Sequence, residues 1–238
     1  MHRPVDTGHY RELSPVFTET QVVPVDRKVM AREYIMSGGT EGAKGAVYRA
    51  LRAQVLQWLT KAGKRSVAIA SVGPREGRTL TAINLAIAIA MDVNQTSLLV
   101  DADLRKPDIH KRFGIEPAHG LEDYLSGAVP LASCLINPSI DRLVILPTRK
   151  PMENSAELLA SPRMTALTKE LRDRYRDRVI IYDTPPLTSG GDAIGFLPNV
   201  ESVLLVVRDG AVRSGEMETA LELLRDRSVI GTVLNAEV

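Results

Sequence analysis

The sequence has 238 residues but only one cysteine and four histidines, and both scarcities limit the chemistry that it can carry. Cys134 cannot form an intrachain disulfide, and no histidine has metal-ligand spacing toward it, so we expect no zinc site. The formal net charge is only +1, which gives no general attraction to a polyanion. Nucleic acid is therefore not an expected partner.

A long apolar run is also absent. The most apolar stretch, Leu80–Met91, is interrupted by Thr81 and Asn84 and is shorter than the roughly 20 residues that a membrane-spanning helix needs. The first residues do not form a basic stretch followed by an apolar one, as an export signal would. We therefore predict a cytoplasmic protein that associates with the inner face of the plasma membrane through a partner.

Charge is unevenly distributed along the chain. Up to Arg65 there are 11 Lys and Arg residues against 6 Asp and Glu, and after it there are 19 against 23. Residues 1–40 show no sustained apolar period and end near a Gly-Gly pair, so we expect a flexible, basic N-terminal arm. Residues 41–238 are predicted to form a single domain, and the hydrophobic content of 44% is ample for its core.

Apolar residues recur at helical spacing between Glu41 and Lys61, which predicts an amphipathic helix. Beyond it, continuous apolar runs alternate with helical segments, and such runs are typical of strands buried on both faces of a parallel sheet. The runs lie at Ser66–Ser71, Ser97–Asp101, Leu143–Leu146, Val179–Asp183, Val203–Val207 and Ile230–Leu234, and the helical segments at Thr79–Met91, Pro162–Tyr175 and Ser214–Arg225. We therefore predict an α/β fold, a three-layer sandwich around a mostly parallel sheet.

The turn between the first of these strands and its helix has features of a phosphate-binding loop. A full P-loop reads G-x-x-x-x-G-K-[ST]. Here Gly77 and Thr79 fit, whereas Val72 stands at the first glycine and Arg78 at the lysine. Backbone amides at a helix N-terminus hold phosphate, and the Thr79 hydroxyl could bind Mg²⁺. The loop by itself is equally compatible with a tight turn from strand to helix.

Three carboxylates follow predicted strands near this loop. Asp101 and Asp103 end one strand and face the same way, because they are two residues apart on extended backbone; Asp183 ends a later strand. Ligands of open α/β folds bind at this carboxyl edge of the sheet. Since Mg²⁺ takes only one or two protein carboxylates, a third would be left to act as a base. The three carboxylates are a stronger signal for nucleotide chemistry than the loop.

These motifs resemble those of a known family. Residues 98–107 resemble the Walker A′ motif, and residues 179–186 the Walker B motif, of bacterial tyrosine kinases of the capsular and exopolysaccharide type. Residues 74–79 resemble that family's P-G-E-G-K-[ST] loop, and segments 120–125 and 157–164 look most like kinases of exosortase-associated loci. The resemblance implies a P-loop NTPase fold and an ATP-dependent protein-tyrosine autokinase that regulates exopolysaccharide or capsule polymerisation and export.

The resemblance also implies roles for individual residues. ATP would be bound by Pro74, Arg75, Glu76, Gly77, Arg78, Thr79 and Leu80, with Asn235 at the adenine, and Mg²⁺ by Thr79, Asp101, Asp103 and Asp183. Asp101 would activate the acceptor tyrosine, with Asp103 and Arg78 as the other catalytic residues. A turn residue at a strand end is an equally good interpretation of Asn235.

The sequence departs from the family pattern at several positions. Arg75 and Arg78 replace a small residue and the lysine of the loop, and the fork of a guanidinium is larger than an ammonium. The family's E-x-x-R-x-x-R helix has Ala46 in place of the glutamate but keeps Arg49 and Arg52, through which self-association is expected. The residues after Asn235 include no tyrosine, so the expected acceptors of autophosphorylation are Tyr10, Tyr34, Tyr48, Tyr124, Tyr175 and Tyr182, the last in a predicted core strand.

Three functional hypotheses follow from these residues. The first is the kinase, working with a membrane-embedded polysaccharide chain-length or co-polymerase protein. The second is a nucleotide-binding pseudokinase that serves as a regulatory subunit of that membrane protein, and Arg78 favours it. The third is a partitioning-type ATPase, although the additional lysine that those proteins carry early in the loop is Gly73 here.

Overall fold

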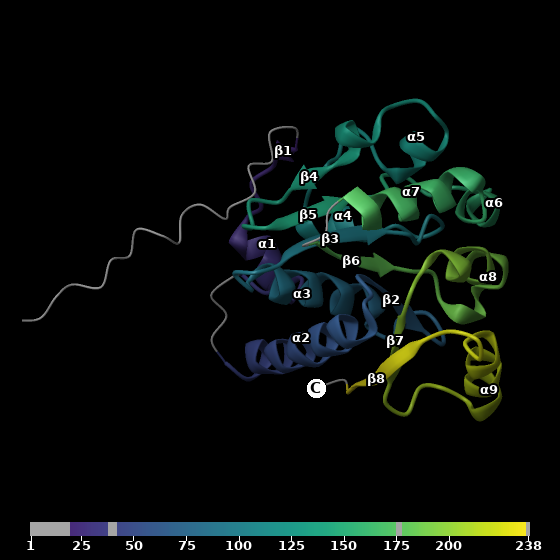
Figure 1. Cartoon of the computed structure of the whole chain (residues 1–238). Coiled ribbons are helices and arrows are strands. Elements are labelled where there is room, and N and C mark those ends of the chain that lie inside the picture. Colours follow the sequence, from purple (N-terminus) through teal and green to yellow (C-terminus); the bar gives the residue numbers. More distant parts are fainter. Residues whose placement is uncertain (1–19, 38–41, 175–177, 237–238) are drawn as a thin grey trace, which may run out of the picture.

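The computed structural model describes residues 20–37, 42–174 and 178–236, and in this part of the chain eight strands form one sheet. Their order across the sheet is β1-β4-β5-β3-β6-β2-β7-β8, and neighbouring strands are parallel except for the antiparallel pair β4 and β5 (Figure 1). The strands are β1 (Gln21–Val22), β2 (Ser66–Ser71), β3 (Thr96–Asp101), β4 (Ile136–Asn137), β5 (Leu143–Leu146), β6 (Arg178–Asp183), β7 (Val203–Arg208) and β8 (Val229–Asn235). The predicted α/β fold with a mostly parallel sheet is confirmed.

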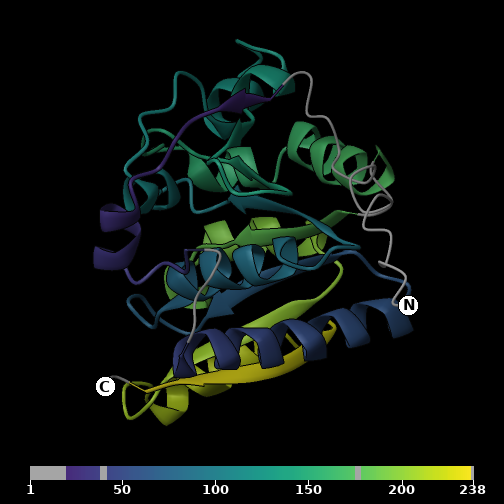
Figure 2. The same ribbon diagram turned by 90° about the vertical axis from the view of Figure 1, so that its left-hand side faces the viewer.

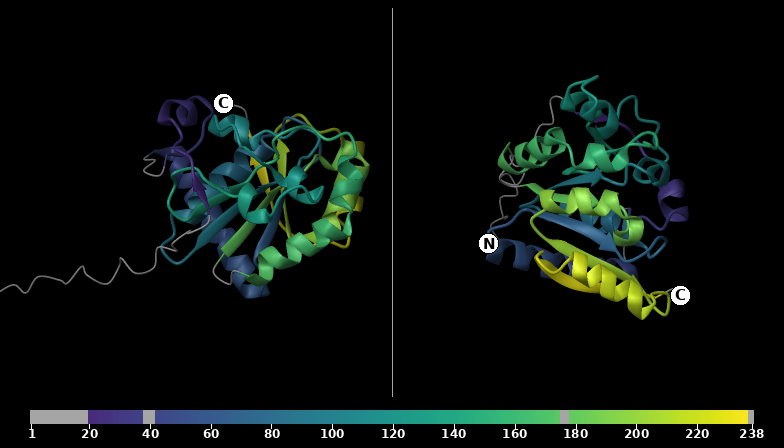
Figure 3. Two further views of the ribbon diagram at one scale, coloured as in Figure 1. Left: turned by 90° about the horizontal axis from the view of Figure 1, so that it is seen from above. Right: turned by 90° about the vertical axis from the view of Figure 1, so that its right-hand side faces the viewer.

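Helices cover both faces of the sheet. They are α1 (Arg27–Arg32), α2 (Ala43–Ala62), α3 (Arg78–Ala90), α4 (Ile109–Phe113), α5 (Leu121–Leu125), α6 (Ser155–Leu159), α7 (Pro162–Arg174), α8 (Gly191–Phe196) and α9 (Ser214–Leu223). Helices α2 and α3 lie side by side on one face (Figure 2), and α7, α8 and α9 lie on the other (Figure 3). Within the described residues, no helix is both long enough and apolar enough to cross a bilayer.

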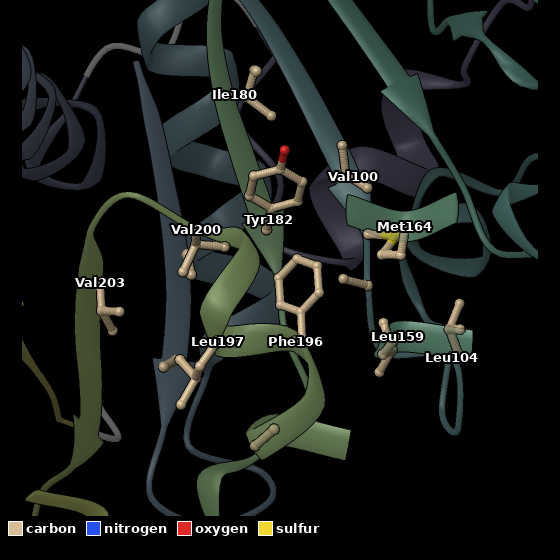
Figure 4. Packing of buried hydrophobic residues seen from close by; sticks show 14 of the residues in the cluster. Val100, Leu104, Leu159, Met164, Ile180, Tyr182, Phe196, Leu197, Val200 and Val203 are labelled. Carbon is tan, nitrogen blue, oxygen red and sulfur yellow. The ribbon is translucent and has the colours of Figure 1, made fainter. Parts of the chain in front are cut away.

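The sheet has one hydrophobic core on each face, as the continuous apolar runs predict. Every residue of β2, β3 and β6 is buried, because helices pack against both sides of these central strands. On the face that α7 and α8 cover, Tyr182 of β6 packs edge-to-face against Phe196 of α8, with ring centroids 5.2 Å apart (Figure 4). Such a pair adds about 0.5–1.5 kcal/mol beyond the burial of its apolar area.

Residues 20–37 differ from the expected flexible arm. Strand β1 extends the sheet through parallel pairing with β4, and Met30, Ile35 and Met36 are buried in the hydrophobic core on the face of the sheet that α3 covers. The side chain of Asn84 on α3 fixes the end of this segment, because it accepts the Met36 N–H at 2.8 Å and donates to the Tyr34 carbonyl at 3.1 Å. The prediction of a structureless arm is therefore wrong for residues 20–37, and residues 1–19 and 38–41 lie outside the described part of the chain.

Candidate functional site

The loop between β2 and α3 is closed by a contact that only glycine permits at position 77. Gly77 has a φ of +87°, and a Cβ atom there would lie 2.1 Å from Nδ2 of Asn235. That nitrogen donates to the Glu76 carbonyl at 3.0 Å, so the end of β8 is tied to the loop. The structure thus places the Asn235 side chain on the loop backbone.

Glu76 has a similar bracing role. It is 4% exposed, and its carboxylate accepts the N–H of Gly73 at the start of the loop and the N–H of Arg208 at the end of β7. These two hydrogen bonds hold the backbone of the loop against the end of β7. Helix α3 begins with the backbone N–H groups of Arg78, Thr79 and Leu80, which have no acceptor within the helix because they lie in its first turn. Free N–H groups at a helix N-terminus are the arrangement that binds phosphate.

Arg75 takes the left-handed conformation at the tip of the loop, with a φ of +61° and an exposed side chain. For a residue with a Cβ atom this conformation costs about 1–2 kcal/mol relative to the right-handed region. The glycine that the family pattern places here would adopt this conformation without that cost. Arg75 adopts it nevertheless, so the loop keeps its shape despite the substitution.

Arg78 reaches back from the first turn of α3 into the carboxylates at the end of the sheet. Its Nε lies 2.9 Å from Oδ1 of Asp183, one terminal nitrogen lies 2.8 Å from Oδ2 of Asp103, and the other lies 3.1 Å from the Ser71 hydroxyl. The arginine is 8% exposed. Position 78 therefore joins the loop to both carboxylate motifs through a buried fork of hydrogen bonds.

Asp101 and Asp183 are register partners on the adjacent strands β3 and β6, and both are buried. Oδ2 of Asp101 accepts the backbone N–H groups of Asp108 and Ile109, at 3.2 and 3.1 Å, where α4 begins. Oδ1 of Asp101 and Oδ2 of Asp183 have no hydrogen-bond partner. Burial, followed by the charge of Asp183, raises the pKa of Asp101 well above its ordinary value.

A cleft of about 910 Å³ opens over the loop. Its lining includes all seven loop residues that were predicted to bind ATP, together with Asp103: Pro74, Arg75, Glu76, Gly77, Arg78, Thr79, Leu80 and Asp103. Asp101, Asp183 and Asn235 do not line it. The predicted site residues thus form one cluster, in which Arg78 and Asp103 stand between the cleft and the deeper carboxylates.

The oxygen-bearing side chains that the structure describes at the cleft do not form a complete metal site by themselves. They suit a divalent cation that arrives together with phosphates. Within the described residues, no three His, Cys, Asp or Glu side chains are grouped so that they could hold a metal ion. Mg²⁺ needs only one or two protein carboxylates when phosphate oxygens and waters complete its shell. The unpartnered Oδ2 of Asp183, together with Asp103 and Thr79 at the cleft, meets that lesser requirement, so the residues fit the ion.

Comparison with known proteins identifies the family. No protein-family model matches the chain. The tyrosine-protein kinase YwqD of Bacillus subtilis is 30% identical over 211 residues, which cover 87% of this chain and 87% of that protein. This chain belongs to the bacterial tyrosine-protein kinase family.

Longer relatives and a solved structure agree with this assignment. The succinoglycan biosynthesis transport protein ExoP of Rhizobium meliloti is 34% identical over 184 residues, which cover 75% of this chain but 23% of ExoP. The kinase domain of the Escherichia coli tyrosine kinase ETK superposes with a TM-score of 0.75 at 25% identity, over 91% of this chain and 89% of that domain. The chain therefore spans most of the Bacillus kinase but about a quarter of ExoP.

One network of this bacterial tyrosine kinase, in which an exposed arginine pairs with a buried aspartate, was not predicted from the sequence. Arg105 lies within the A′ motif, and its Nε donates to Asp192 of α8 at 2.8 Å; Asp192 also accepts the Ser155 hydroxyl of α6 at 2.6 Å. The network anchors the segment after β3 to the opposite wall of the cleft. Arg105 was visible in the motif, but no pattern in the sequence indicated that Asp192 would be its partner.

The candidate acceptor tyrosines of the kinase differ in accessibility. Tyr34 is 67% exposed, whereas Tyr182 is fully buried in the core, which supports its predicted packing role. Tyr48 is half-buried, and Tyr124 is half-buried beneath the Arg163 guanidinium, 4.6 Å from the ring centroid. Tyr10 and Tyr175 lie outside the described residues.

Helix α2 carries the two arginines through which self-association of the kinase is expected, and one of them forms a hydrogen bond within the chain. Arg52 of α2 donates to the Ala88 carbonyl in the last turn of α3 at 3.0 Å. A cation suits the carboxyl end of a helix, because the carbonyls there carry partial negative charge. Arg52 therefore joins α2 to α3, and Ala46, in place of the family's glutamate, is exposed on α2.

Proposed function

We propose that this chain is an ATP-dependent protein-tyrosine kinase that regulates the polymerisation and export of exopolysaccharide or capsule. The family supports the activity, and ExoP, named for succinoglycan biosynthesis transport, supports the process. The single observation that carries the proposal is the cluster of loop, Arg78 and carboxylates at one cleft. The partitioning-type ATPase is not favoured, because proteins that are at least 30% identical over three quarters of this chain or more include a tyrosine kinase and a polysaccharide transport protein.

The residues suggest how transfer would proceed. The amides at the start of α3 would hold the phosphates of ATP. Thr79 and Asp183 would hold Mg²⁺, which would neutralise the charge that develops on the phosphates and would leave Asp103 outside the metal's ligands. The tyrosine oxygen would bond to the γ-phosphorus as the bond to the bridging oxygen breaks and ADP leaves. Asp103, the carboxylate at the cleft, would take the tyrosine proton, a role first expected of Asp101.

Asp101 would then act as a positioning residue. Its carboxylate holds the start of α4, and through that helix it sets the segment in which Asp103 lies. Arg78 would have to exchange its carboxylate partners for phosphate oxygens when ATP binds. This exchange is the step at which the substitution of lysine by arginine has its effect, since the guanidinium makes more directed bonds than an ammonium.

Residues 41–238 would form the catalytic domain, with residues 20–37 packed onto it. The proposed partner is a membrane-embedded polysaccharide chain-length or co-polymerase protein, which would bring the kinase to the inner face of the plasma membrane. The relatives that exceed this chain in length support such a partner, because in them the matching region is one part of a longer protein. Self-association through α2, which carries Arg49 and Arg52, remains a proposal.

The test of the activity is phosphotyrosine formation by the purified protein with Mg²⁺-ATP and a glutamate-tyrosine copolymer. We expect incorporation that Asp103→Asn removes and that Asp141→Asn, a change of an exposed aspartate outside the cleft, leaves intact. Absence of phosphotyrosine on the protein and on the copolymer would exclude the kinase.

A nucleotide-binding pseudokinase is the second candidate, and the double ion pair of Arg78 favours it. Arg78→Lys separates the two. A gain of phosphotyrosine formation in the variant indicates an active site that arginine weakens, whereas nucleotide binding with no turnover in either protein indicates a regulatory subunit.

A further inference from the structure

The cleft contains more positive charge than its own carboxylates neutralise. Its lining has six basic side chains, Arg75, Arg78, Arg105, Lys106, Lys111 and Arg112, and four acidic ones, Glu76, Asp103, Asp108 and Asp192. All four acids already have partners within the protein. Three pair with bases of the same lining, namely Asp103 with Arg78, Asp108 with Arg112 and Asp192 with Arg105, and Glu76 accepts from backbone amides.

Three cations of the lining are left over. Arg75, Lys106 and Lys111 form no ion pair with any described residue, and all three side chains are exposed. Arg75 is at the tip of the phosphate loop, where the phosphates of a nucleotide account for it. Lys106 and Lys111 come from a different wall, the segment that runs from the A′ motif into α4.

This second wall is the one on which the acceptor hydroxyl would meet Asp103. The backbone N–H of Lys106 donates to Oδ1 of Asp103 at 3.0 Å, so the main chain at Lys106 is held beside the carboxylate that would take the tyrosine proton. Lys111 follows on α4, whose first turn is held by Asp101. Two cations without carboxylate partners therefore flank the acceptor side of the cleft.

We propose that Lys106 and Lys111 select acceptor tyrosines with acidic neighbours in their sequence. The inference rests on the proposed kinase function and names its substrate class. Carboxylates that flank the tyrosine would pair with the two lysines, while the tyrosine itself enters between the loop and Asp103. A tyrosine flanked by basic residues would be repelled by the same two lysines. The lysines would therefore favour acidic acceptor segments and disfavour basic ones.

The test measures peptide binding without turnover. Two fluorescein-labelled peptides of equal length carry one tyrosine, flanked in one by glutamates and in the other by glutamines, and anisotropy gives their affinities for the full chain in low salt. We expect the glutamate peptide to bind about tenfold more tightly, as two exposed ion pairs would provide. The double variant K106E/K111E should lose that preference, whereas the control Lys169→Glu, an exposed lysine of α7 outside the cleft, should keep it.

A second measurement separates acceptor recognition from general attraction of anions. The affinity for a fluorescent ADP should be the same in K106E/K111E and in the unmodified protein. Equal binding of the two peptides, a preference that survives the double variant, or a parallel loss of ADP binding would each overturn the inference. If the preference holds but no phosphotyrosine forms, the kinase proposal fails and the recognition of acidic segments stands.

Discussion

Arg78 and Asp183 form a buried ion pair in which Nε of the guanidinium lies 2.9 Å from Oδ1 of the carboxylate. The same guanidinium lies 2.8 Å from Oδ2 of Asp103. In P-loop proteins the lysine at this position contacts the β- and γ-phosphates, but here its counterpart binds the carboxylates of the A′ and B motifs, which belong to the proposed site. In the proposed kinase, phosphates and the divalent cation would therefore compete with these ion pairs.

Removal of the Arg78 charge should destabilise the fold. Arg78→Met leaves Asp103 and Asp183 buried without their counter-ion, and breaking a buried pair in this way costs about 3–5 kcal/mol. The free energy of unfolding in urea at neutral pH measures the effect. Arg32→Met is the control, because the ion pair of Arg32 with Glu33 is exposed and should contribute less than about 1 kcal/mol. Similar losses in the two variants would contradict the buried pair.

Asp101 should make the stability of the protein depend on pH. Because the pKa of Asp101 is raised in the folded state, first by burial and then by Asp183, the folded protein binds more protons than the unfolded chain. The free energy of unfolding should therefore fall as the pH rises from the ordinary carboxyl pKa of about 4 to the raised value. Asp101→Asn keeps an oxygen that can accept the α4 amides and removes the charge, so its stability should fall less over this range.

Urea unfolding at a series of pH values checks this slope. The control is Asp141→Asn, an exposed aspartate, which should retain the pH dependence of the unmodified protein. Parallel curves for Asp101→Asn and the unmodified protein would show that Asp101 is not the group responsible.

Tyr182→Phe should stabilise the protein or leave its stability unchanged. The Tyr182 hydroxyl is fully buried without a hydrogen-bond partner, and burial raises the pKa of this tyrosine above its usual range. Loss of an unsatisfied buried hydroxyl removes a desolvation cost of about 1–3 kcal/mol, while the ring can still pack against Phe196. Thermal unfolding measures the change, and phosphotyrosine content should not fall. A clear drop in stability would mean that the hydroxyl has a partner.

The fold was largely predictable, because the central strands are buried on both faces and show continuous apolar runs. The boundaries of the six predicted strands agree with the structure to within one residue at each end. Residues 20–37 were not predictable, because their order depends on tertiary contacts. A strand of two residues and a helix of six have little local signal, and Asn84, the residue that fixes the segment, lies 48 positions from Met36.

The site was predictable as a set of residues but not as a set of contacts. The motifs placed the loop, Asp103 and Asp183 together, and the sheet order brings them to one edge. The roles of Glu76 and Asn235 as braces depend on how β7 and β8 end beside the loop, which no local pattern encodes. The hydrogen bonds of Asp101 to the first residues of α4 were not predictable either, because α4 is a short helix without a clear sequence period.

The measurement that tests the account most directly is the affinity for a fluorescent ADP, with Mg²⁺ and with EDTA, in the unmodified protein and in Arg78→Lys. A lysine keeps the charge but makes fewer directed bonds to Asp103 and Asp183, so it should release them more readily. We expect Arg78→Lys to bind Mg²⁺-ADP about tenfold more tightly and to gain more from Mg²⁺ than the unmodified protein. The control Arg225→Lys, at an exposed arginine outside the cleft, should change neither value. Equal affinities and equal Mg²⁺ dependence in the two proteins would contradict the claim that Arg78 competes with the nucleotide and its metal.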